Sequence, residues 1–554
     1  MEVGKITIGD LVDVMANRFP DNDALVYPFK DLRCTYSQFR DVCNQAAKGF
    51  MKLGIKRGEH IAIWANNVPE WVLTQFSTGK MGAVLVTVNT NYRSHELEYL
   101  MKQSESTTLL LVNGIKEKNE YLKIIYEVCP ELKTSQQGQL NCQKLPLLRN
   151  VIFLGDEKQP GMFNWSEVMA MGDEVSDAEL AERQASLRSD DVINMQYTSG
   201  TTGFPKGVML THTNLIGNAI SLAECMNLSE VDRMCIPVPF FHCFGCVLGT
   251  LTCVVSGAAM IPVEVFNPVA VLETVQAERC TALHGVPTMF ITELAEMEKK
   301  KYDTSSLRTG IMAGAPCPIE VMKQVVNTMG ASEICITYGQ TEASPGITMT
   351  RVDDPLELRV STVGKALPNV EVKIVNPDTG EEVPAGVQGE LCTRGYHIMK
   401  GYYNMPEATA SAIDKDGWLH TGDLAVMNEN GYCKITGRLK DMIIRSGENI
   451  YPREIEEFLY TNPKIKDVQV VGVPSERYGE EVVAFIQLKE DQTSSLEEIR
   501  EFCKGKISRF KIPKFVLFLD EYPTTASGKI QKYRLREQAI KDLGREKDSS
   551  IETA

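Results

Sequence analysis

Apolar and polar positions follow two alternating periods along roughly the first 350 residues of the chain. Segment 35–54, "TYSQFRDVCNQAAKGFMKLG", has apolar residues at helical spacing and ends on a glycine, which predicts a helix with Gly54 as its C-cap. A proline predicts the start of a second helix at Pro69, and a serine cap predicts a third helix at Ser94. The apolar runs "HIAIWA", "AVLVTV" and "TTLLLV" predict strands between these helices. Alternating strands and helices predict parallel sheets covered by helices.

The pattern changes after Gly364. The runs "VEVKIV", "GELCTRG" and "GYCKITGR" are short and are separated by Gly, Pro and Asn, which is typical of a small antiparallel unit. Beyond them, helical and strand patterns mix in a compact α+β set. We therefore predict an α/β protein with a large N-terminal domain of two helix-covered sheets and a small β-barrel-like subdomain, followed by a small α+β domain. The predicted ranges are 1–437 for the large domain, 438–441 for the boundary, 442–545 for the small domain and 546–554 for a polar tail.

The most apolar segment is "TLTCVVSGAAMIPV" at 250–263. It is shorter than the roughly 18 residues that a membrane-spanning helix requires, so it predicts buried core and no membrane span. The first residues, "MEVGKITIGD", have neither the basic and apolar regions of a secretory signal nor the arginines of a transit peptide. We expect a cytoplasmic protein, or one of the mitochondrial matrix if a transit segment has been removed.

Composition narrows the choice of partners. The chain has 554 residues, which is too long for one hydrophobic core, so more than one domain is expected. Its net charge of −15 argues against non-specific nucleic-acid binding, which needs excess Lys and Arg. The 15 cysteines are scattered, which favours reduced thiols over a disulfide framework. Any phosphate contact should therefore be local, and we expect small-molecule partners and a monomer or homodimer.

One stretch has the residue types of a phosphate-binding loop. In "QYTSGTTGFPKG", glycines allow close backbone approach, hydroxyls donate hydrogen bonds and a lysine adds positive charge. The Walker ending GK[ST] is missing, and taken alone the stretch could also be a solvated loop. The predicted phosphate-binding residues are Thr198, Ser199, Gly200, Thr201, Thr202 and Lys206.

Six further motifs follow this loop in order: "PFFHCFG", "AGAP", "YGQTE", "GWLHTGDL", "GRLKDMIIRSGENIYPREIE" and "PTTASGKIQK". With the loop, they give the chain a resemblance to the adenylate-forming superfamily of acyl-CoA synthetases, luciferases and peptide-synthetase adenylation domains. The resemblance covers essentially the full chain and is closest to medium-chain fatty acyl-CoA synthetases. It implies ATP, Mg²⁺ and CoA as cofactor and co-substrates, and a small C-terminal domain that is mobile about a hinge at 438–441.

The resemblance also implies residue roles. Lys529 would swing into the cleft to bind both the acid and the α-phosphate, Thr341 would donate to the α-phosphate, and Glu342 would hold Mg²⁺. Asp423 and Arg438 would bind the ribose hydroxyls, and Lys440 would be the hinge residue. The adenine slot would be lined by Gly314, Ala315, Pro316, Tyr338 and Gly339. The CoA side would include Gly447, Glu448 and Asn449, and the acyl pocket His242, Val247, Met312, Gly339 and Ala343.

The function implied is that of an AMP-forming acyl-CoA synthetase, with a medium-chain fatty acid as substrate. An alicyclic or aromatic carboxylate, such as cyclohexane carboxylate, cyclohexene carboxylate or benzoate, is the alternative substrate. A luciferase-like or carrier-loading enzyme would share the first half-reaction. A noncatalytic nucleotide-binding protein of the same fold is a further alternative, although it would have little need for a mobile lysine. The direction of the reaction in vivo stays open.

Overall fold

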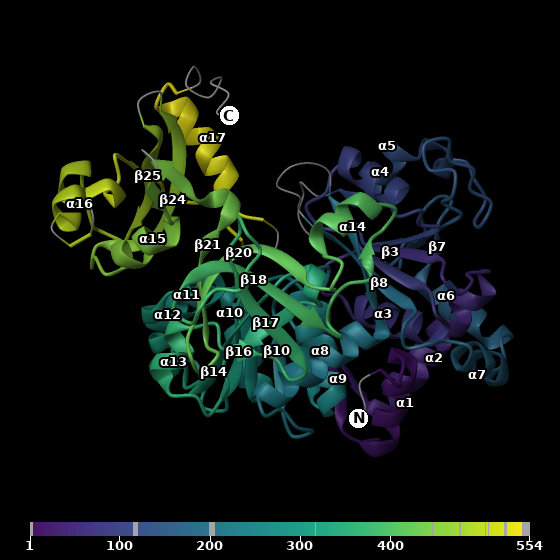
Figure 1. Cartoon of the computed structure of the whole chain (residues 1–554). Helices are drawn as coiled ribbons and strands as arrows, with labels where there is room; N and C mark the ends of the chain where they lie inside the picture. Colours follow the sequence, from purple (N-terminus) through teal and green to yellow (C-terminus); the bar gives the residue numbers. More distant parts are fainter. Residues whose placement is uncertain are drawn as a thin grey trace.

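The computed structural model describes residues 4–114, 120–198, 205–315, 317–445, 448–475, 478–504, 506–507, 509–525 and 529–545. Figure 1 shows a large body formed by most of the chain and a smaller unit formed by its last part, around α15, α16 and α17. The predicted α/β architecture with a large and a small unit is confirmed. No helix in the described parts of the chain is long and apolar enough to cross a membrane.

The first sheet of the large body has eight strands in the order β19-β9-β8-β4-β3-β5-β6-β7. Neighbours from β8 to β7 run parallel, and β9 and β19 are added antiparallel at one edge. The three strands expected from the N-terminal pattern are all present in this sheet. The bounds are β3 His60–Trp64, β4 Val84–Thr87, β5 Thr108–Leu111, β6 Asn150–Phe153, β7 Phe163–Asn164, β8 Val192–Thr198, β9 Lys206–Thr211 and β19 Gly401–Tyr402.

The second sheet has nine strands in the order β16-β15-β14-β13-β12-β10-β11-β1-β2. The six from β14 to β1 are parallel, and the strands at both edges are antiparallel. The bounds are β1 Asp23–Tyr27, β2 Leu32–Thr35, β10 Arg233–Ile236, β11 Ala259–Pro262, β12 Ala282–Gly285, β13 Thr309–Met312, β14 Glu333–Gly339, β15 Gly346–Met349 and β16 Lys365–Ala366. The apolar segment 250–263 supplies buried residues to this layer, as predicted.

Helices fill the space between the sheets and cover their outer faces. One core cluster joins side chains of both sheets to α1 (Ile8–Arg18), α2 (Tyr36–Lys52), α3 (Pro69–Met81) and α8 (His212–Cys225), which therefore lie between the sheets. α3 is buried on nearly all sides, in keeping with its mixed apolar and small polar sequence. The outer face of the first sheet is covered by α4 (Ser94–Gln103) and α5 (Tyr121–Val128). The outer face of the second is covered by α10 (Pro268–Glu278), α11 (Pro287–Lys299) and α12 (Ile319–Gln324).

Two of the predicted helix ends can be compared directly. Gly54 has φ of +82°, just beyond the C-cap residue Leu53, so the glycine takes the left-handed position that ends α2. The predicted cap Ser94 is instead the first helical residue of α4, and Arg93 holds the N-cap position. The remaining α-helices among the described residues of the large body are α6 Trp165–Met171, α7 Asp177–Ala185, α9 Thr252–Ser256, α13 Leu356–Ser361 and α14 Pro406–Ala412.

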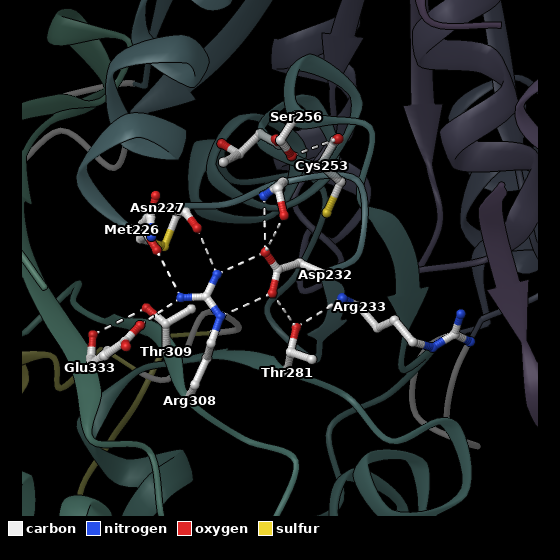
Figure 2. A network of polar contacts seen from close by, with 12 residues as sticks. Met226, Asn227, Asp232, Arg233, Cys253, Ser256, Thr281, Arg308, Thr309 and Glu333 are labelled. Atoms are coloured by element: carbon white, nitrogen blue, oxygen red, sulfur yellow. Dashed lines mark hydrogen bonds and ion pairs between the residues drawn. The ribbon is translucent and has the colours of Figure 1, made fainter. Parts of the chain in front are cut away.

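A polar network ties together the amino ends of four neighbouring strands in the second sheet (Figure 2). Arg308, before β13, donates to both oxygens of Asp232, at 3.1 and 2.8 Å, and to Glu333 at 2.6 Å. Thr281, before β12, donates to Asp232 at 2.7 Å. Although burial alone would raise the pKa of Asp232, these donors leave it lowered. The network stabilises the amino ends of these strands. The carboxyl ends, on the opposite side of the sheet, are therefore available for chemistry.

The third sheet is the predicted antiparallel unit, in the order β17-β18-β20-β21. Its bounds are β17 Val370–Val375, β18 Gln388–Gly395, β20 Leu419–Met427 and β21 Cys433–Arg438. A short turn at Leu439–Asp441 follows β21, so the predicted hinge falls between this sheet and the next strand.

The small unit has the strand order β23-β22-β25-β24, with β26 added beside β25. Its bounds are β22 Ile443–Arg445, β23 Glu448–Ile450, β24 Ile465–Ser475, β25 Gly479–Leu488, β26 Phe515–Phe518, α15 Pro452–Tyr460, α16 Leu496–Cys503 and α17 Lys532–Asp542. Helices α15 and α16 cover one face and α17 the other, which gives the unit two cores of its own.

Candidate active site

Most of the predicted site residues lie at or beyond the carboxyl ends of parallel strands. Thr198 ends β8, Gly314 and Ala315 follow β13, and Tyr338 and Gly339 end β14. β13 and β14 are parallel neighbours in the second sheet, whereas β8 belongs to the first sheet, and the edge strand β19 connects the two through a hydrogen bond from Tyr402 to Glu342. We refer to the region at these strand ends as the crevice. The sequence motifs are thus brought together by topology.

The predicted phosphate loop connects two antiparallel strands. Thr198 pairs with Lys206 where β8 and β9 leave the sheet. Ser199, Gly200, Thr201 and Thr202 lie outside the described residues. Lys206 Nζ lies 4.8 Å from the centre of the Tyr402 ring, a cation–π contact. The base of the loop therefore carries a positive charge packed on an aromatic ring.

Tyr402 is a residue that the sequence reasoning missed. It lies on β19, which pairs with β9, and its hydroxyl donates to Glu342 Oε1 at 2.8 Å. Burial and Glu342 raise the pKa of Tyr402. Tyr402 thus links the predicted metal carboxylate to the predicted phosphate lysine. A two-residue strand far from the recognised motifs has no local signal that could have identified it.

Thr341 and Glu342 lie in a tight turn, Thr341–Ala343, directly after β14. The turn needs a glycine at Gly339, because a Cβ there would lie 1.8 Å from the carbonyl oxygen of Pro345. Gln340 N–H donates to that same carbonyl at 3.0 Å. The close backbone approach explains why a glycine precedes the predicted catalytic pair.

The predicted ribose residues face each other across two strands. Asp423 on β20 is directly opposite Arg438 on β21, and Arg438 Nε donates to Asp423 Oδ1 at 2.9 Å. The Tyr338 hydroxyl donates to Asp423 Oδ2 at 2.8 Å. The Asp423 carboxylate raises the pKa of Arg438, and burial raises the pKa of Tyr338. Both oxygens of Asp423 are oriented by fixed donors, which suits a carboxylate that accepts from two hydroxyls.

Lys529 extends from the small unit into this crevice. Its N–H donates to Thr525 Oγ1 at 3.0 Å, and its Cε lies 3.6 Å from the point where a Cβ on Gly314 would be. Burial lowers the pKa of Lys529, whereas the charges of Asp423 and Glu342 act in the opposite direction. The ammonium therefore interacts electrostatically with both predicted carboxylates.

His242 interacts electrostatically with the same ammonium. Its Nδ1 accepts the N–H of Phe244 at 3.2 Å, which places the ring proton of the neutral imidazole on Nε2. Burial and the charge of Lys529 lower its pKa to about 3, so His242 is neutral at physiological pH. A neutral ring suits the predicted substrate-lining role and gives no ground for proton transfer.

Cys243 and Cys246 form a C-x-x-C sequence that the interpretation of the cysteines as scattered overlooked. Cys243 Sγ lies 3.9 Å from Thr341 Oγ1, and burial raises its pKa to about 11. All fifteen cysteines are free in the structure. The pair is therefore a buried, protonated feature next to the predicted catalytic threonine.

The residues predicted for the acyl pocket are divided between two cores. Val247 packs with Ile311 and Ala313 in the cluster between the two large sheets. Met312 and Ala343 pack in the cluster on the outer face of the second sheet. Successive strand residues point to opposite faces, so Met312 and Ala313 cannot both face one pocket. Of Val247, Met312 and Ala343, only Val247 belongs to the cluster between the two large sheets, which also contains Cys243 and Phe244.

Several predicted positions can be placed only in part. Gly314 has φ of +85°, in the left-handed region that favours glycine. Pro316 and Gly447 lie outside the described residues. Lys440 falls in the turn after β21, and Glu448 and Asn449 begin β23, opposite Arg445 and Ile444. Their predicted roles stay predictions.

The donor set fits ATP and a divalent cation. Lys206 and Lys529 supply positive charge for phosphates, and Asp423 is a nearly buried acceptor for hydroxyls. Glu342 supplies the carboxylate oxygens that Mg²⁺ prefers. These residues could hold the sugar of a nucleotide at Asp423 and its phosphates at Lys206 and Lys529.

Comparison with known proteins identifies the class. Residues 12–403 match the model of the AMP-binding enzyme family, and residues 454–529 match that of the AMP-binding enzyme C-terminal domain. The chain belongs to this family of adenylate-forming enzymes. Within it, the chain is an AMP-forming CoA ligase, since its curated relatives are acyl-CoA synthetases.

Two relatives and two solved structures illustrate the similarity. The chain is 60% identical to YngI of Bacillus subtilis (strain 168), provisionally named an acyl-CoA synthetase, over 96% of this chain and 97% of that protein. It is 43% identical to the mitochondrial medium-chain acyl-CoA ligase ACSF2 of Danio rerio, over 97% and 89%. ATP-bound MatB from Rhodopseudomonas palustris has 28% identity and a TM-score of 0.83, covering 97% of this chain and 99% of that one. The anthranilate CoA ligase AuaEII with anthranoyl-AMP has 25% identity and a TM-score of 0.87, covering 98% and 99%.

Proposed function

We propose that the enzyme activates a medium-chain fatty acid with ATP to acyl-AMP and then transfers the acyl group to CoA. The single observation that carries the proposed chemistry is the position of the Lys529 side chain beside Gly314, where its charge interacts with Asp423, Glu342 and His242. The chain-length assignment is supported by the similarity to ACSF2. The AuaEII structure supports an aromatic acid as the second candidate substrate, with an alicyclic acid such as cyclohexane or cyclohexene carboxylate as a related possibility.

In the first half-reaction, a carboxylate oxygen bonds to the α-phosphorus of ATP and the bond to pyrophosphate breaks. The reacting groups are both anionic, so a positioned cation offsets their repulsion. Lys529 supplies this charge from the small unit, and Lys206 supplies charge at the base of the phosphate loop. Bound Mg²⁺ would neutralise phosphate charge near Glu342. No proton transfer is required of Lys529 or His242.

In the second half-reaction, the CoA sulfur attacks the acyl carbonyl carbon, its proton passes to solvent and AMP leaves. Lys529 occupies the crevice in this structure, so the thiol route needs the small unit to turn. We assign the pivot to Lys440, in the turn between the third sheet and the small unit. The CoA-side residues Gly447, Glu448 and Asn449 would then approach the crevice.

We also propose that residues 1–437 form the large domain and residues 442–545 the small domain. The proposed location is the cytoplasm. Fifteen free cysteines favour a reducing compartment. The mitochondrial matrix is the alternative, since the ACSF2 relatives are named as mitochondrial.

The test is pyrophosphate release and acyl-CoA formation with ATP and Mg²⁺ across a carboxylate panel, with and without CoA. The panel contains straight chains from acetate to palmitate, benzoate, and the two cyclic carboxylates. An optimum at middle chain length supports the fatty-acid assignment. Preference for a ring acid would keep the mechanism and overturn the substrate. Pyrophosphate release with no CoA product would identify a different acyl acceptor.

A further inference from the structure

A buried carboxylate lies on the strand next to the one that carries Asp423. Glu390, on β18, is 8% exposed and faces the neighbouring strand β20, which carries Asp423. Its Oε1 accepts the N–H of Gly422 at 2.9 Å, and its Oε2 accepts from His420 Nδ1 at 2.8 Å. Both oxygens of Glu390 are thus used to hold the segment that leads to Asp423.

That segment is a bulge in the sheet. Glu390 pairs with Leu424 and Cys392 pairs with His420, so three residues of β20 stand opposite Leu391 alone. Gly422, in the middle of the bulge, has φ of +69°. A bulge re-aims side chains and leaves backbone groups outside the ladder, and these need other partners.

A second interaction supports the same bulge. The Thr421 hydroxyl donates to the carbonyl of Leu391 at 2.6 Å and accepts the N–H of Asp423 at 3.1 Å. Glu390 and Thr421 together hold the amide groups of Gly422 and Asp423. The direction in which the Asp423 side chain points is set by these two contacts as well as by Tyr338 and Arg438.

The ligand-type atoms of Glu390, Cys392 and His420 also lie within 4.8 Å of one another. Such a group could hold a metal ion. However, both oxygens of Glu390 already accept hydrogen bonds from β20, and His420 Nε2 lies 3.6 Å from Asp414 on its other side. The contacts of Glu390 therefore favour a role in holding the strand.

We propose that Glu390 is a positioning residue for nucleotide recognition: by fixing Gly422 and His420 it aims Asp423 at the ribose hydroxyls. Glu390 itself touches no substrate. The inference rests on the proposed ribose role of Asp423, and it adds the residue that gives Asp423 its orientation.

The test compares ATP with dideoxy-ATP, which lacks both ribose hydroxyls, in wild-type enzyme, Glu390→Ala and Glu390→Gln. The wild type should prefer ATP in kcat/KM. Loss of an oriented, charged hydrogen bond costs about tenfold to a hundredfold. In Glu390→Ala, kcat/KM should fall by that factor with ATP and only slightly with dideoxy-ATP, while KM for the acid stays unchanged. Glu390→Gln keeps an acceptor for Gly422 and should recover most of the preference.

A matched control is available on the adjacent strand. Glu371, on β17, has an exposed carboxylate paired with Arg394 at 2.8 Å and lies outside the bulge. Glu371→Ala should keep the full preference for ATP. If Glu390→Ala does not fold, Glu390→Asp keeps the charge but shortens the reach, and it should show an intermediate loss.

Two outcomes would overturn the inference in distinguishable ways. A wild-type enzyme with no preference for ATP over dideoxy-ATP would remove the ribose role of Asp423 and the positioning role with it. A wild-type preference that Glu390→Ala and Glu390→Asp retain, or equal losses with both nucleotides, would overturn the role of Glu390 alone.

Discussion

The Tyr402 hydroxyl donates a hydrogen bond to Oε1 of Glu342 at 2.8 Å, which joins the edge strand β19 to the turn after β14. Lys206 Nζ packs over the face of the same tyrosine ring. One side chain therefore orients both the predicted metal carboxylate and the lysine at the base of the phosphate loop.

We expect Tyr402→Phe to keep the ring contact and lose the hydrogen bond. Adenylation should fall about tenfold, because a hydrogen bond to a charged group is worth roughly 1.5–3 kcal/mol. The Mg²⁺ concentration needed for half-maximal pyrophosphate release should rise. Tyr432→Phe is the control, since its hydroxyl bonds Asp354 away from the crevice. Unchanged Mg²⁺ dependence in Tyr402→Phe would argue against the linking role.

Replacement of Lys529 should separate the two half-reactions. Lys529→Ala should reduce pyrophosphate release by about a hundredfold to a thousandfold, as loss of a transition-state donor does. Thioester formation from supplied acyl-AMP should be largely kept, because the lysine has then left the crevice. Lys541→Ala, on the exposed end of α17, should affect neither step. Equal losses in both half-reactions would mean that Lys529 does not act in adenylation specifically.

The pH dependence of adenylation should reflect the ionisation of Lys529. Burial lowers the pKa of Lys529 from its ordinary value of 10.5, so the ammonium form is present at low pH and is lost as pH rises through the lowered value. In the free enzyme, kcat/KM for ATP should therefore fall on the alkaline side before pH 10.5 is reached. Lys529→Arg should remove this decline, because guanidinium stays charged. An alkaline limb that persists in Lys529→Arg would belong to another group.

A buried carboxylate outside the crevice affects stability. Glu293, on α11, is 1% exposed and neither oxygen has a hydrogen-bond partner among the described residues. Burial raises its pKa from 4.5 to about 8. The folded protein then holds a proton that the unfolded chain has lost, so stability falls as pH rises between these two values.

Glu293→Gln should therefore stabilise the enzyme, by on the order of 4 kcal/mol above pH 8 and by much less near pH 4.5. Thermal unfolding at several pH values measures this difference. Glu298→Gln, on the exposed face of the same helix, is the control. A stabilisation that does not vary with pH would show that ionisation of Glu293 is not its cause.

The fold was predicted from the sequence where local pattern decides it. Short apolar runs between helical segments predict the parallel strands. Short runs separated by Gly, Pro and Asn after Gly364 predict the antiparallel sheet. Asp423 and Arg438 were grouped only through the family resemblance, and the register of β20 and β21 now gives the physical reason.

The rest depends on long-range contacts or on overlooked local rules. Tyr402 and Glu390 act through neighbours on other strands, so their own surroundings in the sequence carry no signal. The grouping of Met312 with Val247 overlooked strand alternation, which places Met312 and Ala313 on opposite faces. The C-x-x-C at Cys243 was visible in the sequence and was missed.

The most direct test is mass analysis of the products formed from octanoate, ATP and Mg²⁺, with and without CoA. We expect octanoyl-CoA, AMP and pyrophosphate when CoA is present, and enzyme-bound octanoyl-AMP with pyrophosphate when it is absent. Formation of ADP and phosphate, or no nucleotide cleavage with any carboxylate, would contradict the adenylate mechanism.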